Sequence, residues 1–261
     1  MNGLSALVTG STSGIGLATA KVLASRGCHI IMTGLGSAAT IEQCLTDIKS
    51  AGHGNISVHS LEADLQRPEE VHTLCKEALK LHPKGIDILV NNAGAQYVVP
   101  VEDFPLEKWN LLMNVNLTSA FLLIKYLLPK MKENDWGRII NVASAHGLVA
   151  SVNKSAYCAA KHGLIGLTKV VALETIKTGV TCNAICPGWV LTELVQKQLD
   201  DITREKNISI GEAQEVLFQH MPSGKCTTPE EIGELVAYLC SGGSGNIRGS
   251  SISIDGGWVA Q

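Results

Sequence analysis

A tyrosine and a lysine four positions apart, Tyr157 and Lys161, follow a serine at position 144. On the helix that the surrounding sequence predicts, this spacing places both side chains on one face. A phenol has a pKa of about 10, and a neighbouring ammonium favours its ionised form. Lowering that pKa to about 7 takes about 4 kcal/mol, which a buried cation and a second positive charge could provide. We predict that Tyr157 moves a proton beside Lys161, while Ser144 hydrogen-bonds the reacting oxygen.

Two further polar residues, His146 and Lys154, lie between that serine and tyrosine, where proton transfer alone does not require them. An imidazole, an ammonium and amide donors suit a carboxylate, which accepts several hydrogen bonds. The alternative is that each is a solvated surface side chain. We predict a carboxylate site with an apolar wall beside Ser144 and Tyr157, because ligands of open α/β sheets bind at the strand ends. Its members are Gln96, His146, Lys154, Trp189, Gln198 and Trp258.

Composition indicates one domain over residues 1–261. The chain is 45% hydrophobic with a net charge of −3, and its Lys and Arg residues are dispersed, which argues against a nucleic-acid or anionic-membrane surface. The start, MNGLSALVTG, predicts a strand without a leader, and the apolar stretch FLLIKYLL is expected to be too short to span a bilayer. We therefore expect a cytoplasmic protein. The eight cysteines lack CxxC spacing and predict reduced core thiols, with no metal site.

Strand-like and helical segments alternate along the chain, which predicts a doubly wound α/β fold with a parallel sheet. The predicted strands are 6–10, 29–34, 56–64, 87–94, 138–144, 180–188 and 250–257. The predicted helices are 15–26, 38–51, 69–81, 107–132, 154–177 and 229–240.

One segment, residues 190–224, falls outside this alternation. It is charged, helical by pattern and inserted after a strand end, so we predict a lid over the ligand site. The alternative is a pair of helices with no role beyond the surface.

The first predicted strand runs into TGSTSGIG, residues 9–16, and then into a helix. Glycines at 10, 14 and 16 allow backbone amides to approach a pyrophosphate at a helix N-terminus. A plain tight turn is the alternative, but the strand before the motif and the helix after it favour a dinucleotide site.

Four motifs in this order resemble the short-chain dehydrogenase/reductase family over the whole chain: TGxxxGIG, NNAG at 91–94, YxxxK with its serine, and CPGW at 186–189. The resemblance implies a Rossmann fold with a seven-stranded sheet, and a homotetramer that packs through helices 107–132 and 154–177. It also implies that Asn116 holds a water that relays protons through Lys161, with Asn114 as the alternative.

The cofactor predicted on this basis is NAD. The second strand ends MTGLG with no acidic residue after it, yet no basic residue at 11–13 or 34–37 would neutralise a 2′-phosphate. Asp64 would accept from the adenine amino group, or else cap the next helix. The expected cofactor contacts are Gly10, Thr12, Ser13, Gly14, Ile15, Gly16, Leu35, Asp64, Leu65, Asn92, Ala93, Gly94, Tyr157, Lys161, Pro187, Gly188, Val190 and Thr192.

Within the family, SAHGLVASVNKSAY, WGRII, TCNAICPGWV and SIDGGW are similar to a branch whose members interconvert D-3-hydroxybutyrate and acetoacetate with NAD. The resemblance implies that Gln96, His146, Lys154 and Gln198 hold the substrate carboxylate. Two alternatives remain at this point: a reductase of another 3-oxo substrate such as a 3-oxoacyl thioester, and a non-catalytic protein that senses a dinucleotide.

Overall fold

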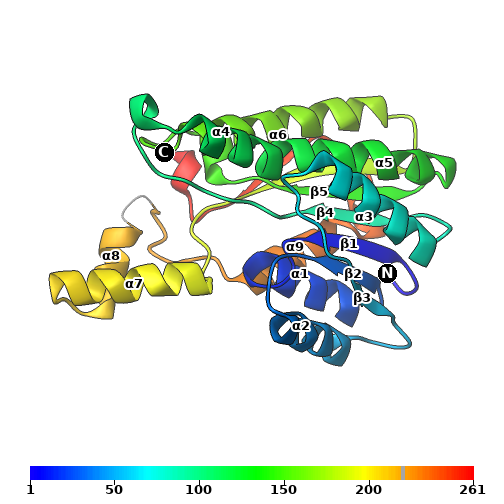
Figure 1. Ribbon diagram of the computed structural model, residues 1–261, viewed down its shortest axis with the longest axis horizontal. Coiled ribbons are helices and arrows are strands. Elements are labelled where there is room, and N and C mark those ends of the chain that lie inside the picture. The colour runs from blue at the N-terminus through cyan, green and yellow to red at the C-terminus, as the bar shows by residue number, and fades with distance from the viewer. Residues whose placement is uncertain (219–220) are drawn as a thin grey trace.

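The computed structural model describes residues 1–218 and 221–261, and contains a seven-stranded parallel sheet (Figure 1). The strand order is β3-β2-β1-β4-β5-β6-β7, so the predicted doubly wound fold is confirmed. The strands are β1 Ser5–Thr9, β2 His29–Thr33, β3 Val58–Ser60, β4 Ile88–Asn91, β5 Gly137–Val142, β6 Val180–Pro187 and β7 Ser251–Ile254. The strands β3, β4 and β7 are much shorter than predicted, and the edge strands β3 and β7 each pair with a neighbour on one side only.

Helices cover both faces of the sheet, and each face has its own apolar core (Figure 1). One layer consists of α1 Gly14–Ser25, α2 Ala38–Ala51 and α9 Pro229–Leu239. The other consists of α3 Pro68–Leu81, α4 Leu106–Met113, α5 Ser119–Glu133 and α6 Ser155–Glu174. Alternate residues of β1 serve the two cores, with Ala6 and Val8 in the first and Leu7 in the second. Burial on both faces explains why these strands are nearly continuously apolar.

The helix predicted at 107–132 is divided by a π-helical segment, Asn114–Thr118, between α4 and α5. The Asn116 side chain donates through Nδ2 to Leu112 O at 2.9 Å. In an α-helix that carbonyl would accept the Asn116 backbone N–H, so the side chain competes with the regular pattern. The wider turn therefore has a local cause, which helical periodicity does not reveal.

The combined run Leu106–Glu133 is long and apolar enough to cross a membrane, so the expectation that this stretch is too short is wrong. However, 44% of its apolar window is buried inside the protein, where Leu123 and Leu127 belong to the second core. A helix of this composition is equally typical of a protein core.

The predicted helical insertion is present as α7 Glu193–Lys206 and α8 Ile210–Leu217, which lie away from the sheet (Figure 1). Of the expected segment 190–224, residues 219–220 lie outside the described part of the chain. The pair has a small core of Val195, Leu199, Ala213, Phe218 and Met221. Trp189 and Trp258 pack against that core, so the insertion contacts two residues expected at the substrate site.

All eight cysteines are free thiols, as predicted. Six are buried, whereas Cys158 and Cys226 are partly exposed, so the interpretation as core residues holds for most of the set.

Candidate active site

Strand β5 and helix α6 bring the predicted serine and tyrosine together. Ser144 follows the end of β5, and its Oγ accepts the backbone N–H of His146 at 3.1 Å, which fixes the turn Ala145–Gly147. Tyr157, in the first turn of α6, shares a side-chain hydrogen bond with Ser144. The two hydroxyls therefore face the same point, where the oxygen of a substrate can meet both.

Lys161 lies one turn further along α6, with only 3% of its surface exposed. Its Nζ donates to Val142 O at 2.8 Å and lies 5.6 Å from the centre of the Tyr157 ring. Burial lowers the pKa of Lys161 to about 8, while the neighbouring Cys186 acts in the opposite direction. At neutral pH the side chain is an ammonium whose proton is only weakly held, as a relay requires.

Burial dominates the pKa of Tyr157 in the fold. It raises that pKa, and the hydrogen bond with Ser144 only partly opposes the increase. The sequence argument required the Lys161 ammonium together with a second positive charge, so the lowered pKa stays a prediction for the protein with its cofactor bound. Both groups lose water on folding, and desolvation disfavours the phenolate just as it disfavours the ammonium.

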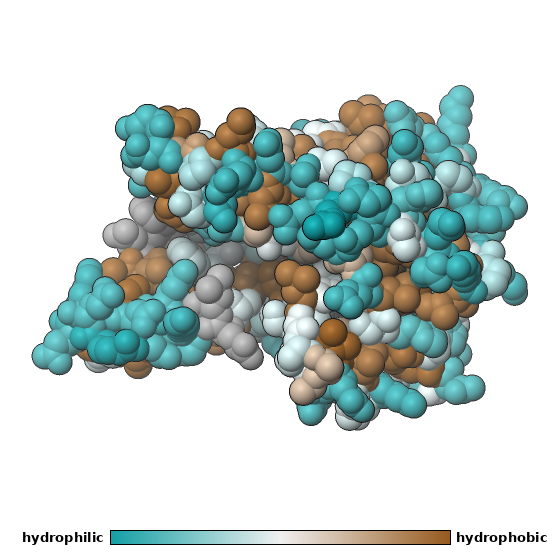
Figure 2. All heavy atoms as spheres, viewed as in Figure 1, coloured by the Kyte–Doolittle hydropathy of each residue, from teal (hydrophilic) through white to brown (hydrophobic). Residues whose placement is uncertain are grey.

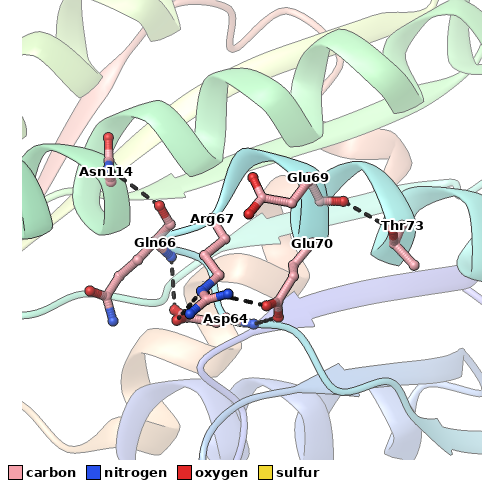
Figure 3. Close-up of polar contacts among 7 residues, drawn as sticks. All are labelled: Asp64, Gln66, Arg67, Glu69, Glu70, Thr73 and Asn114. Carbon is pink, nitrogen blue, oxygen red and sulfur yellow. Dashed lines mark hydrogen bonds and ion pairs between the residues drawn. The ribbon is translucent and has the colours of Figure 1, made fainter.

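The two candidate relay asparagines point in different directions. Asn116 is buried, donates to Ala95 O and Leu112 O, and accepts from Ala95 N at 3.2 Å. A methyl group built on Gly94 would lie 2.9 Å from Asn116 Oδ1 and 3.7 Å from Lys161 Nζ, so both side chains border Gly94. Asn114 instead donates to Gln66 O at 3.3 Å, in the loop after β3 (Figure 3). The geometry favours Asn116 as the neighbour of the lysine.

The glycine turn and the NNAG segment are interlocked at the ends of β1 and β4. The Thr9 hydroxyl accepts the backbone N–H groups of Asn92 and Ala93 at 3.0 and 2.9 Å. A Cβ on Gly16 would clash with Gly10 O, and one on Gly10, whose φ is +63°, would lie 2.9 Å from Ala93 Cα. Only glycine fits at these two positions. Sequence analysis did not single out Thr9, although it directly precedes the turn.

The start of α1 fits the pyrophosphate of a dinucleotide. Within the described residues, Ser13 forms no side-chain cap and the first turn contains no acidic residue. The first amide groups and the positive end of the helix dipole are therefore available to an anion. Gly14, with φ of +50°, adjoins Thr192 at the start of the helical insertion, since its Cβ would lie 3.2 Å from Thr192 Cγ2. The cofactor turn and the expected lid thus meet.

The remaining predicted cofactor positions surround this turn. Thr12 donates to Leu35 O at 2.8 Å, and Leu35 itself is 75% exposed at the end of β2. Pro187 ends β6, and Gly188 lies against Asp255, where a Cβ would come 2.9 Å from Asp255 Cα. Val190 bridges to Thr227. The contact of Leu35 with the adenosine of the cofactor stays a prediction.

Asp64 lies in a group of charged side chains after β3 (Figure 3). Its Oδ1 accepts Gln66 N–H at 3.0 Å, and Arg67 Nε lies 3.6 Å from Asp64 Oδ2 and 3.7 Å from Glu70 Oε1. Arg67, not Asp64, precedes the first residue of α3, so the helix-cap alternative is wrong. The predicted contact with adenine remains a prediction for a carboxylate that this turn holds in place.

His146 and Lys154 form a pair, with His146 Nε2 and Lys154 Nζ 3.1 Å apart. Burial and the adjacent Lys154 charge lower the pKa of His146 to about 4, and burial lowers the pKa of Lys154. Because an ammonium only donates, Nε2 accepts and the imidazole proton resides on Nδ1. Nδ1 is buried without a partner among the described residues. The half-buried Lys154 therefore has two spare donor hydrogens, as a carboxylate requires, whereas the Nδ1–H of His146 is closed off from solvent.

Of the other residues predicted at this site, the two tryptophans contact the pair, and the two glutamines are not hydrogen-bonded to it within the described residues. The Trp258 ring centre lies 5.1 Å from that of His146, and Lys154 Nζ lies 5.9 Å from that of Trp189. Gln96 is exposed after β4, and Gln198 is half-buried on α7. In Figure 2 the surface is hollowed between the helical insertion and the upper layer.

Comparison with known proteins identifies the family of the chain. The model of the short chain dehydrogenase family matches residues 5–203. The chain belongs to this family. Over their full lengths, the chain is 52% identical to the D-beta-hydroxybutyrate dehydrogenase of Cupriavidus necator. It is 46% identical to that of Rhizobium meliloti over 98% of each chain. A crystal structure of actinorhodin polyketide ketoreductase with NADPH superposes with a TM-score of 0.89 at 32% identity, over 99% of each chain.

Family membership makes this chain an oxidoreductase that uses a nicotinamide dinucleotide. The glycine turn and the uncapped start of α1 remain the predicted cofactor site, and the serine, tyrosine and lysine side chains remain the predicted reacting groups.

The glycine turn gives a first testable prediction. Gly16→Ala should weaken NADH binding at least about tenfold, because the added methyl overlaps Gly10 O and must displace the turn. NADH binding is measured by the change in protein fluorescence on titration. Gly166→Ala on α6 is the matched control, since its Cβ meets nothing within 4 Å. Equal NADH affinity in Gly16→Ala and the wild type would contradict the prediction that the glycine turn binds the cofactor.

A second prediction concerns the pH dependence of stability. The pKa of His146 falls from 6.5 in the unfolded chain to about 4 in the fold, so the unfolded state binds more protons between those values. The free energy of unfolding should therefore decrease as pH falls from 6.5 to 4, by at most about 3 kcal/mol from this residue. Urea unfolding between pH 4 and 6.5 measures this free energy. His146→Asn should make it nearly independent of pH in this range, and Lys154→Met should narrow the pH range over which it changes. An unchanged pH dependence in His146→Asn would show that His146 is not the responsible group.

Proposed function

We propose that the protein catalyses the NAD-dependent interconversion of D-3-hydroxybutyrate and acetoacetate. The observation that carries the proposal is the contact between half-buried Lys154 and buried His146, 3.1 Å apart, beside Tyr157. The full-length identity with two D-beta-hydroxybutyrate dehydrogenases supports it independently.

The pair distinguishes a small hydroxy acid from other substrates. A carboxylate at one end of the molecule would accept from Lys154 and His146, with Gln96 and Gln198 as further donors, while the carbonyl carbon lies near Tyr157. Trp189 and Trp258 would bound the short apolar part. A 3-oxoacyl thioester has no carboxylate to compensate the charge of half-buried Lys154, so this alternative has less support.

Proton transfer is assigned to residues of β5 and α6. During oxidation, Tyr157 accepts the proton of the substrate hydroxyl while Ser144 keeps that oxygen aligned. Lys161, hydrogen-bonded to Val142 O, then passes the proton on beside Asn116. A bound NAD provides the hydride acceptor and a positive charge that offsets the unfavourable burial of the Tyr157 phenolate.

We assign a closing movement to the helical insertion, with α7 bringing Gln198 toward the pair, because its core already includes contacts with Trp189 and Trp258. We also propose a cytoplasmic homotetramer. Free thiols suit a reducing compartment. Exposed apolar side chains on α5 and α6, including Phe121, Val170 and Leu173, suit subunit contacts.

The cofactor proposal can be tested by comparing NAD with NADP. The value of kcat/KM should be at least about tenfold higher with NAD, because an unpaired 2′-phosphate beside Leu35 costs more than about 1.4 kcal/mol. Initial rates with D-3-hydroxybutyrate and each cofactor provide the measurement. Comparable efficiencies would mean that another cation compensates the phosphate.

The proton-transfer role of the tyrosine can be tested by removing its hydroxyl. Tyr157→Phe should bind NADH nearly as the wild type does and lower kcat for D-3-hydroxybutyrate oxidation about 100-fold or more. Absorbance of NADH follows the turnover. A variant with near wild-type turnover would require another proton route.

The substrate proposal predicts a selective effect of Lys154. In Lys154→Ala, kcat/KM for D-3-hydroxybutyrate should fall about 30- to 1000-fold, because the buried carboxylate loses its charged partner. The neutral methyl ester should be oxidised no worse than by the wild type, and His146→Ala should show the same selectivity more weakly. An equal loss on acid and ester would assign Lys154 to support of α6 instead.

A further inference from the structure

Three buried polar side chains form a hydrogen-bonded chain through the middle of the sheet to α6. Asn91 Nδ2 donates to Asn141 Oδ1, and Asn141 Nδ2 donates to Thr168 Oγ1, each at 2.8 Å. Asn141 and Thr168 are fully buried. Asn91 and Asn141 are register partners on β4 and β5, so the chain joins two central strands to the helix of the active site.

The direction of each bond is fixed by its neighbours. The Thr168 hydroxyl donates its single hydrogen to Leu164 O at 2.8 Å, so its oxygen can only accept from Asn141. The other near neighbour of Asn141 Nδ2 is Cys182 Sγ at 3.7 Å, a weak acceptor. Thr168 is therefore the main partner of a donor that has no access to water. Removing its oxygen would leave that donor poorly satisfied.

Thr168 shares its helix face with the reacting residues. Positions 157, 161, 164 and 168 recur at the spacing of one helical face, which is the face against β5. Two successive residues of β5 are hydrogen-bonded to this face of α6. Asn141 donates to Thr168 through its side chain, and the Val142 carbonyl accepts from Lys161. Ser144 follows on the same segment of chain. The relative position of Tyr157, Lys161 and Ser144 thus depends on how α6 lies along β5.

Apolar contacts alone leave this position weakly defined. The surrounding residues, such as Leu164, Ile165 and Ala143, pack without directional preference. A buried hydrogen bond, by contrast, restricts both distance and direction.

We propose that Thr168 is a positioning residue, whose hydrogen bond with Asn141 sets the place of α6 along β5 and hence aligns Tyr157 and Lys161 with Ser144. The proposal rests on the roles given to those three residues under the proposed function. Thr168 touches none of the reacting groups itself.

A pair of matched substitutions separates alignment from general packing. Thr168→Val replaces the bonded hydroxyl by a methyl of similar size. Thr181→Val makes the same change on neighbouring β6, at a fully buried threonine whose Oγ1 has no partner among the described residues. Thr168→Ser restores the hydroxyl and is the rescue variant.

Thr168→Val should lower kcat for D-3-hydroxybutyrate oxidation about 5- to 20-fold, because small misplacements of reacting groups reduce rates steeply. The apparent pKa on the acid side of the pH profile of kcat should rise by about 0.5 unit, because a displaced Lys161 ammonium stabilises the Tyr157 phenolate less. Affinity for NADH should stay within about twofold, because the glycine turn is unaltered. The titratable side chains that act on Tyr157 and Lys161 are His146, Cys158 and Cys186, with Lys154 beside His146, and all variants retain them.

Thr168→Ser should return both kcat and this apparent pKa toward wild type, and Thr181→Val should leave both unchanged. The proposal is overturned if Thr168→Val lowers only the urea midpoint while kcat and its pH profile stay at wild type. An equal loss in Thr181→Val would also overturn it, because core packing would then explain the effect. If the valine variant does not fold, Thr168→Cys replaces it, and a wild-type pH profile and kcat in that variant overturn the proposal.

The proposed function fails in a different way. Turnover by Tyr157→Phe at the wild-type rate would remove the assigned proton route, whatever the Thr168 variants do. An impaired Tyr157→Phe together with an unaffected Thr168→Val would reject the positioning role alone.

Discussion

The buried ammonium of Lys161 is the charge on which the arrangement of the site depends. Taking such a charge out of water is costly unless fixed dipoles replace the water. Within the described chain no carboxylate pairs with it, and the Val142 carbonyl accepts from it at 2.8 Å. That carbonyl belongs to a central strand, and the lysine to the helix covering it. The Lys161 charge is compensated only while α6 keeps its position against β5, so the chemistry of the site depends on the packing of the core.

A second cation, Lys154, stands near the first but under different constraints. It is only half-buried, contacts the neutral imidazole of His146, and has its Nζ over the ring of Trp189, which packs against the core of the helical insertion. Burial lowers the pKa of both lysines, so both would be stabilised by a nearby anion. Under the proposed function, Lys161 serves proton transfer from within the core, and Lys154 orients the carboxylate of the substrate from the rim.

The cofactor turn is joined to this centre through backbone contacts. Thr9 accepts from Asn92 and Ala93, and Asn116 binds both backbone groups of Ala95. The segment after β4 is thus held between the glycine turn and the π-helical segment. Asn114 extends the connection to the loop that contains Asp64 (Figure 3). Binding at the turn and reaction at α6 use one continuous scaffold.

The sequence by itself determined the features that rest on local pattern. Glycines at fixed positions between a strand and a helix predicted the dinucleotide turn, and the spacing of Tyr157 and Lys161 predicted a shared helix face. Apolar strands alternating with helices predicted the doubly wound sheet. Each of these signals acts over a few residues, because helix and strand periods repeat over short distances.

Tertiary structure decided what depends on burial and on partners distant in the chain. The raised pKa of Tyr157 follows from packing around α6, and the choice between Asn114 and Asn116 follows from where the π-helical turn aims each side chain. The bond from Asn141 to Thr168 joins residues with no sequence pattern between them. Desolvation and hydrogen-bond direction are properties of the assembled surroundings, so they became defined only when β5 and α6 came together.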